Sequence, residues 1–166
     1  CLVNDQHIDC PKLFEVGQLD ALRNLSLIRA SITDEGLKKL AGLRQLTDLD
    51  LSETRVQGTG LPVLPQLSTL YMSDTAATDE GLANIGKLSA LVYLMLDQSA
   101  VGDTGLAELK GLNSLESLNL EDTNVAGPGL VHLKDLRNLG SLTLNQCAVS
   151  SNHLAPLAEC TKLRNL

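Results

Sequence analysis

The 166-residue chain is poor in aromatic side chains, with one phenylalanine, two tyrosines and no tryptophan. Surfaces that bind nucleic acid usually combine stacking aromatic side chains with a basic patch, whereas the net charge here is −7. No apolar run approaches the roughly 18 residues that a membrane-spanning helix needs. The composition therefore argues against a nucleic-acid partner and against a membrane span, and it favours a basic partner if the partner is charged.

Cysteine is scarce as well, with four residues and no C-x-x-C pair. This number is too small for a disulfide scaffold, and the spacing fits neither a zinc knuckle nor a thioredoxin-type site. We expect Cys147 and Cys160 to be small, buried hydrophobic side chains. Two alternatives stay open at the other end: a disulfide between Cys1 and Cys10 in an exported protein, or a lipid on Cys1 after signal cleavage.

The sequence shows no constellation that supports catalysis. A nucleophile with its base, paired carboxylates in a pocket or metal ligands at a working spacing would be needed. The three histidines, His7, His132 and His153, are scattered along the chain, which argues against a shared metal site. We therefore predict that these residues form no active site and hold no cofactor.

A regular repeat runs through the chain, and its period of about 24 residues lies in the range of stacked-repeat proteins. Gly-Leu pairs mark it at Gly36-Leu37, Gly60-Leu61, Gly81-Leu82, Gly105-Leu106 and Gly129-Leu130, with one shorter interval between the second pair and the third. Between the pairs the pattern L-x-x-L-x-L recurs, followed five residues later by another apolar side chain, as from Leu46 to Val56. No single unit can bury its own leucines, so the units must stack around one continuous core.

Each unit has two halves with different periodicities. The Leu-x-Leu part alternates as a short strand does. Leucines at three-residue steps over 37–43 predict one or two helical turns with an apolar stripe. Thr33 and Thr78, each followed by Asp-Glu, are predicted helix N-caps. Pro62 and Pro65 stand where the shorter unit should have its helix, so we expect an extended or irregular chain there.

The full pattern, L-x-x-L-x-L-x-x-T-x-V-T-D-x-G-L-x-x-L-x-x-L, resembles the leucine-rich repeat family over essentially all 166 residues. The slot that usually holds Asn or Cys is filled by Thr54, Thr75, Ser99, Thr123 and Cys147, whereas Gln6 and Ala30 depart from it. The helical half resembles the cysteine-containing and ribonuclease-inhibitor-like subclasses. The resemblance implies an α/β fold: a curved, horseshoe-shaped solenoid with a parallel β-sheet on the concave face and short helices on the convex face. A fold of this kind says little about function.

The repeat pattern reaches both ends of the sequence. Val3 lies one period before Leu27, and Leu166 lies one period after Leu142. We therefore predict one solenoid of about seven repeats over residues 1–166. Solenoids need polar caps at their ends, and neither end shows one. We expect a fragment of a longer chain, or ends that missing sequence or another subunit covers.

The alternation also predicts which side chains point outward from the sheet, with equivalent residues of neighbouring units about 5 Å apart. Tyr71, Tyr93 and Met95 fall on adjacent middle strands and would form an exposed apolar patch. Tyrosines with a polar surround are common hot spots of protein interfaces. Tyrosine is also a good strand former, so scattered surface residues are the alternative interpretation.

Acidic residues surround this patch. The outward positions include Asp48 and Asp50, while Asp97 and Glu121 are neighbours in one column. The column beside the latter pair comprises Arg29, Glu53, Asp74, Gln98, Asp122 and Gln146. Like charges opposite each other on a sheet are mildly destabilising, which a basic partner or a calcium ion would relieve. The alternative is a solvated acidic face that only keeps the protein soluble.

We predict a non-catalytic protein–protein interaction module that binds a protein partner, basic if it is charged, through the concave strand face. The predicted partner-binding residues are Tyr71, Tyr93, Met95, Asp48, Asp50, Asp97 and Glu121. One alternative is a structural or adaptor subunit that docks through its ends or helical face, resembling F-box ubiquitin-ligase adaptors. Another is an inhibitor of a basic enzyme, resembling ribonuclease inhibitor. A cytoplasmic location is favoured.

Overall fold

The computed structural model describes residues 16–166. Its sheet contains six parallel strands in chain order: β1 (Asn24–Ser26), β2 (Asp48–Asp50), β3 (Thr69–Tyr71), β4 (Tyr93–Met95), β5 (Ser117–Asn119) and β6 (Ser141–Thr143). An isolated bridge from Ser141 to Asn165 extends the sheet beyond β6. The strand predicted around Val3 lies outside the described residues, as do Gln6, His7 and the Cys1–Cys10 alternatives.

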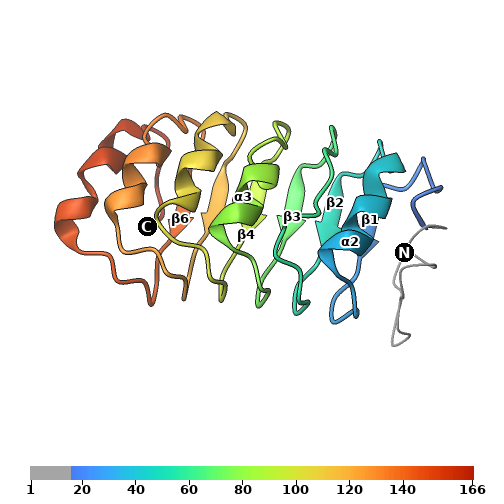
Figure 1. The fold of residues 1–166 in the computed structure, drawn as a ribbon. Helices are drawn as coiled ribbons and strands as arrows, with labels where there is room; N and C mark the ends of the chain where they lie inside the picture. Colours follow the sequence, from blue (N-terminus) through green and yellow to red (C-terminus); the bar gives the residue numbers. More distant parts are fainter. Residues whose placement is uncertain (1–15) are drawn as a thin grey trace.

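Short helices form a row on the other side of the sheet (Figure 1). They are α2 (Asp34–Leu37), η1 (Lys38–Gly42), α3 (Asp79–Ile85), η2 (Gly105–Gly111), η3 (Pro128–Leu133), η4 (Ser151–His153) and η5 (Ala155–Glu159), where η denotes a 3₁₀ helix. Thr33 caps α2 and accepts a hydrogen bond from Gly36 N at 3.4 Å, whereas Thr78 stands at the N-cap of α3 without a side-chain bond. Residues 61–64 form no helix, as the prolines predicted.

One continuous hydrophobic core lies between the strands and the helices. Leu49, Leu70 and Leu94 lie side by side in the strand register, and each is fully buried. A three-residue strand offers one inward leucine, so each unit buries its leucine against the units before and after it. Complete burial of such a side chain contributes about 2 kcal/mol.

Hydroxyl groups in the predicted Asn-or-Cys slot bond to the carbonyl three residues earlier, just after the strand of the same unit. The hydroxyl of Thr54 donates to Leu51 O at 2.6 Å, and that of Thr123 donates to Leu120 O at 2.7 Å. Cys147 donates from Sγ to the same Leu120 oxygen at 3.0 Å. It is half-buried, which corrects the prediction of a buried thiol; Leu144 and Val149 of the same unit are also only partly buried, so this unit is less covered than those before it.

Cys160 is buried as predicted, with 4% of its surface exposed. Burial raises the pKa of its thiol, and the nearby charges of Asp135 and Glu159 act in the same direction. A thiol that resists ionisation is a poor nucleophile. This cysteine therefore acts as a small hydrophobic side chain of the core.

Every strand is followed by a residue in the left-handed backbone region, three positions after the last strand residue. These residues are Arg29, Glu53, Asp74, Gln98, Asp122 and Gln146, with φ between 51° and 58°. A side chain in this conformation costs roughly 1–2 kcal/mol, which glycine avoids. The column that alternation placed along the strands is therefore a row of turn residues, because the strands end before they reach it.

Gln98→Gly is expected to raise the stability by about 0.5–1 kcal/mol, because it removes the side chain that the left-handed turn disfavours. For a chain of this size the melting temperature rises by roughly 2 °C. Gln66→Gly is the matched control: Gln66 is exposed as well and its φ is not positive, so the same replacement lowers the stability. Thermal unfolding followed by circular dichroism measures both, and a stabilised control or a destabilised Gln98 variant would contradict the turn's cost.

Aspartate side chains tie consecutive units together at the start of the helical half. Asp34 accepts from the backbone N–H groups of Gln57 and Gly60, both at 2.8 Å. Asp103 accepts from Gly127 N at 3.1 Å and from Gly129 N at 2.7 Å. Each aspartate thus satisfies backbone donors of the next unit; for Asp103 these include Gly129 N in the first turn of η3, where a helix leaves its N–H groups without an intrahelical partner.

The same close approach explains the glycine that marks each repeat. A Cβ atom on Gly60 would lie 1.7 Å from Asp34 O, and one on Gly129 would lie 2.5 Å from Asp103 O. His153 takes the place of this glycine in the next unit, one period after Gly129. A Cβ atom on Gly127 would lie 2.3 Å from His153 Nδ1, so Gly127 makes room for the larger side chain.

Candidate functional site

The candidate site is the outward side of the parallel sheet, called here the strand face. Tyr71 on β3 lies directly beside Met95 on β4, and Tyr93 lies beside Thr69. Tyr71 is 38% exposed and Tyr93 is 45% exposed, whereas Met95 is half-buried. The register thus brings these three side chains together at the middle of the sheet; Tyr71, Tyr93 and Met95 are called the tyrosine patch below.

Two aspartates lie on β2, next to the tyrosine patch. Asp50 is directly opposite Tyr71 in the register, and Asp48 is opposite Thr69. The Thr47 hydroxyl donates to Asp48 Oδ2 at 2.6 Å, and the Ser52 N–H donates to Asp50 Oδ1 at 3.0 Å. Both carboxylates are half-buried at the face.

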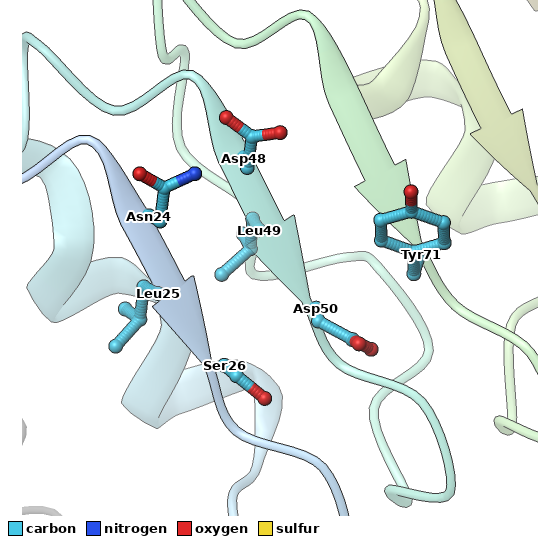
Figure 2. Close-up of a pocket in the computed structure, with 7 residues that line it drawn as sticks. All are labelled: Asn24, Leu25, Ser26, Asp48, Leu49, Asp50 and Tyr71. Atoms are coloured by element: carbon cyan, nitrogen blue, oxygen red, sulfur yellow. The ribbon is translucent and has the colours of Figure 1, made fainter. Parts of the chain in front are cut away.

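These residues line a shallow pocket, called the β1–β3 pocket, with a volume of about 240 Å³. Figure 2 shows Asp48, Asp50 and the Tyr71 ring on neighbouring strands around it. Its lining is Asn24, Leu25, Ser26, Asp48, Leu49, Asp50 and Tyr71. Leu25 and Leu49 are buried core residues, so the side chains exposed around the pocket are the polar Asn24, Ser26, Asp48 and Asp50 together with Tyr71.

Tyr93 borders a different pocket, called the β4–β6 pocket, with a volume of about 480 Å³. The lining residues are Tyr93, Glu116, Ser117, Asn138, Gly140, Ser141, Lys162, Arg164 and Asn165. Lys162 Nζ donates to Asn138 Oδ1 at 2.7 Å. The sequence columns missed the two basic residues because neither occupies a column position: Lys162 lies one repeat period after Asn138, and Arg164 one period after Gly140, both before the strand.

Asp97 and Glu121 lie beyond the strand ends, and neutral donors bind their carboxylates. Asp97 Oδ1 accepts from Ser73 Oγ at 2.8 Å and from Asn119 Nδ2 at 3.1 Å. Gln146 Nε2 lies 3.4 Å from Glu121 Oε1. Both carboxylates of this column therefore have hydrogen-bond donors within the protein.

Glu53, placed next to Asp74 by the sequence columns, forms an ion pair with Arg29 at 2.6 Å. At least one acid of each pair therefore has a partner within the protein. In the part of the chain that the structure describes, no group of three or more His, Cys, Asp or Glu side chains is placed to hold a metal ion. The same residues contain no helix long and apolar enough to cross a membrane.

An open, six-stranded parallel sheet with one short strand per repeat and short helices behind it is a leucine-rich-repeat solenoid, which confirms the predicted fold class. The chain is similar to an internalin (inlF) from Listeria monocytogenes, with a TM-score of 0.74 and 21% identity over 92% of this chain. It is also similar to internalin C2 (inlC2) from the same species, with a TM-score of 0.62 and 21% identity over 96% of this chain.

The chain spans 49% of the first internalin and 74% of the second. At this level of identity the similarity establishes the fold, and it does not confirm either of the two predicted repeat subclasses. No protein-family model matches the sequence, and no curated protein matches it.

Proposed function

We propose that the protein is a non-catalytic interaction module that binds a protein partner through its strand face. The observation that carries this proposal is the tyrosine patch: two of the chain's three aromatic residues are exposed on adjacent strands at the middle of one sheet. Exposed tyrosines with an apolar neighbour and a polar surround are typical of interface hot spots.

The backbone hydrogen bonds that hold the strand face support the same function. Backbone hydrogen bonds to both neighbouring strands hold the patch; for example, the Leu51 N–H donates to Tyr71 O and the Met72 N–H donates to Met95 O, both at 2.9 Å. Side chains on such a fixed frame lose little conformational freedom when a partner binds, which favours affinity. This rigidity suits recognition by a preformed surface.

A structural or adaptor subunit would dock through the helical face, which offers less clustered apolar surface to a partner. Its exposed large apolar residues include Val63 and Val131, which belong to units separated by two others. Isolated apolar residues of this kind are normal on protein surfaces. We therefore rank the adaptor function second.

The test compares affinity capture by the wild type with capture by a Tyr71→Ser/Tyr93→Ser/Met95→Ser variant. Loss of interface hot spots costs about 2 kcal/mol or more for each residue, so we expect partners to be lost from the triple variant. The matched control, Val63→Ser/Val131→Ser, removes exposed apolar surface from the helical face and should retain the same partners.

Circular dichroism must show that both variants keep the wild-type spectrum and melting transition. Equal recovery by the triple variant and the wild type would contradict binding through the strand face. Loss of partners from the control alone would instead favour the adaptor function.

A further inference from the structure

The two pockets of the strand face lie on either side of the tyrosine patch and differ in charge. The β1–β3 pocket has two carboxylates, Asp48 and Asp50, and no basic residue in its lining. The β4–β6 pocket has Lys162 and Arg164 against a single acid, Glu116. The strand face therefore has a negative end and a positive end.

The negative pocket has the chemistry to hold a guanidinium group. Asp48 and Asp50 lie two residues apart on the same side of β2, which separates their Cα atoms by about 7 Å. A carboxylate can accept about four hydrogen bonds, and the single bond from Thr47 or Ser52 leaves capacity on each. An arginine side chain has five N–H donors in a planar fork, and its flat face can stack on the ring of Tyr71.

The other acids of the strand face do not offer this combination. Asp97 already accepts bonds from Ser73 and Asn119. Glu53 is paired with Arg29. Neither residue lines the pocket beside Tyr71.

The positive pocket suits a carboxylate. Arg164 and Lys162 both line it next to Tyr93, with the hydroxyl side chains of Ser117 and Ser141 as further donors. Asp48 and Arg164 are five units apart, and five strand spacings amount to about 24 Å. An extended peptide covers this distance in about seven residues.

We propose that the partner presents an extended segment that crosses the strands, with an arginine in the β1–β3 pocket and an Asp or Glu about seven residues away in the β4–β6 pocket. The tyrosine patch then contacts the residues in between. This inference rests on the proposed function and adds the charge order of the segment that the strand face recognises.

The test is an NMR titration of the ¹⁵N-labelled chain with a synthetic peptide that has one arginine and one glutamate seven positions apart in a serine–threonine sequence. We expect amide shifts in β1–β3 and around Ser141 and Asn165. Replacing arginine with citrulline keeps the shape and removes the charge, so binding should weaken at least tenfold and the β1–β3 shifts should disappear. Replacing glutamate with glutamine should do the same at the β4–β6 pocket.

A pair of protein variants tests the same inference from the other side. Asp48→Asn/Asp50→Asn should weaken the arginine peptide at least tenfold. Asp74→Asn/Asp122→Asn changes the net charge equally but alters exposed turn residues that line neither pocket, so it should bind as the wild type does.

Equal weakening by both variants would overturn the inference, because it would show that only the net charge matters. Shifts confined to residues outside the two pockets and the tyrosine patch, or no shifts, would overturn it as well. Concentration-dependent shifts without peptide would overturn it too, because they would show that a second copy of the chain occupies the face. If the tyrosine triple variant loses its partners while the peptide maps to neither pocket, the proposed function stands and this inference fails; if that variant keeps its partners, the proposed function itself fails.

Discussion

Replacing Gly60 with alanine is expected to destabilise the protein by about 3 kcal/mol, the upper part of the range for overpacked sites. The new Cβ atom would lie 1.7 Å from Asp34 O and 2.4 Å from Asp34 C. Both are backbone atoms, so no side chain can move aside to make room. Either the backbones of two consecutive units separate or the bond between Asp34 and Gly60 N is lost.

Gly111→Ala is the control, because a Cβ atom at that position has no other atom within 4 Å. This replacement reduces the freedom of the unfolded chain, so we expect no loss and a gain of about 0.5 kcal/mol. Urea unfolding followed by circular dichroism measures both variants. If Gly60→Ala were as stable as the wild type, the close approach of consecutive units could not be the reason for the repeated glycine.

The leucine spacing was sufficient to predict the fold because the side chains at the inward strand positions have a single role, which is to pack in the core. Leu49, Leu70 and Leu94 follow the same motif, and they lie in register although the segment between the first two is three residues shorter. That deletion falls in the segment with Pro62, where a helix would otherwise form. Hydrophobic periodicity therefore defined both the strands and the place where the chain tolerates a change of length.

The polar links between units could not be predicted from the same pattern. In the sequence Asp34 was only one of the two acids that follow the predicted N-cap Thr33, yet its carboxylate binds backbone groups of the next unit. Such a bond depends on the distance between two units, which the sequence of one unit does not encode. The left-handed turn at Gln98 was missed for a related reason: without glycine or asparagine at that position, nothing in the sequence marks it.

For the candidate site, the sequence predicted which side chains lie next to one another on the strand face, but it did not predict the two pockets. Alternation was enough to bring Tyr71 next to Met95, because register and face follow from the repeat. The alternation gave no reason to rank Asp48 above Asp97 as a binding residue. In the structure Asp48 lines a pocket, whereas Asp97 accepts hydrogen bonds from Ser73 and Asn119. Donors from neighbouring strands decide which acid can still take a ligand.

Leu94→Ala is expected to cost about 4 kcal/mol, because Leu94 is fully buried on a central strand, with Leu70 and Leu118 beside it. The cavity would lie between units on both sides of β4, where neither can collapse without leaving its hydrogen-bonded register. Leu157→Ala makes the same chemical change in η5, the last helix, where the side chain of Leu157 is 4% exposed and the nearby Leu154 and Leu163 are only partly buried. There we expect about 2 kcal/mol, the lower end of the range for such replacements.

The difference in position should also appear in the cooperativity of unfolding. In a solenoid each unit is stabilised only by its neighbours, so a weak central interface divides the chain into two parts that can unfold separately. We expect the urea m-value of Leu94→Ala to fall, and hydrogen exchange to report different opening free energies for β1–β3 and β5–β6. Leu157→Ala should keep the wild-type m-value, because it weakens one end and leaves the central interfaces intact. Equal losses of stability with unchanged m-values would show that the chain unfolds as one unit whichever interface is weakened.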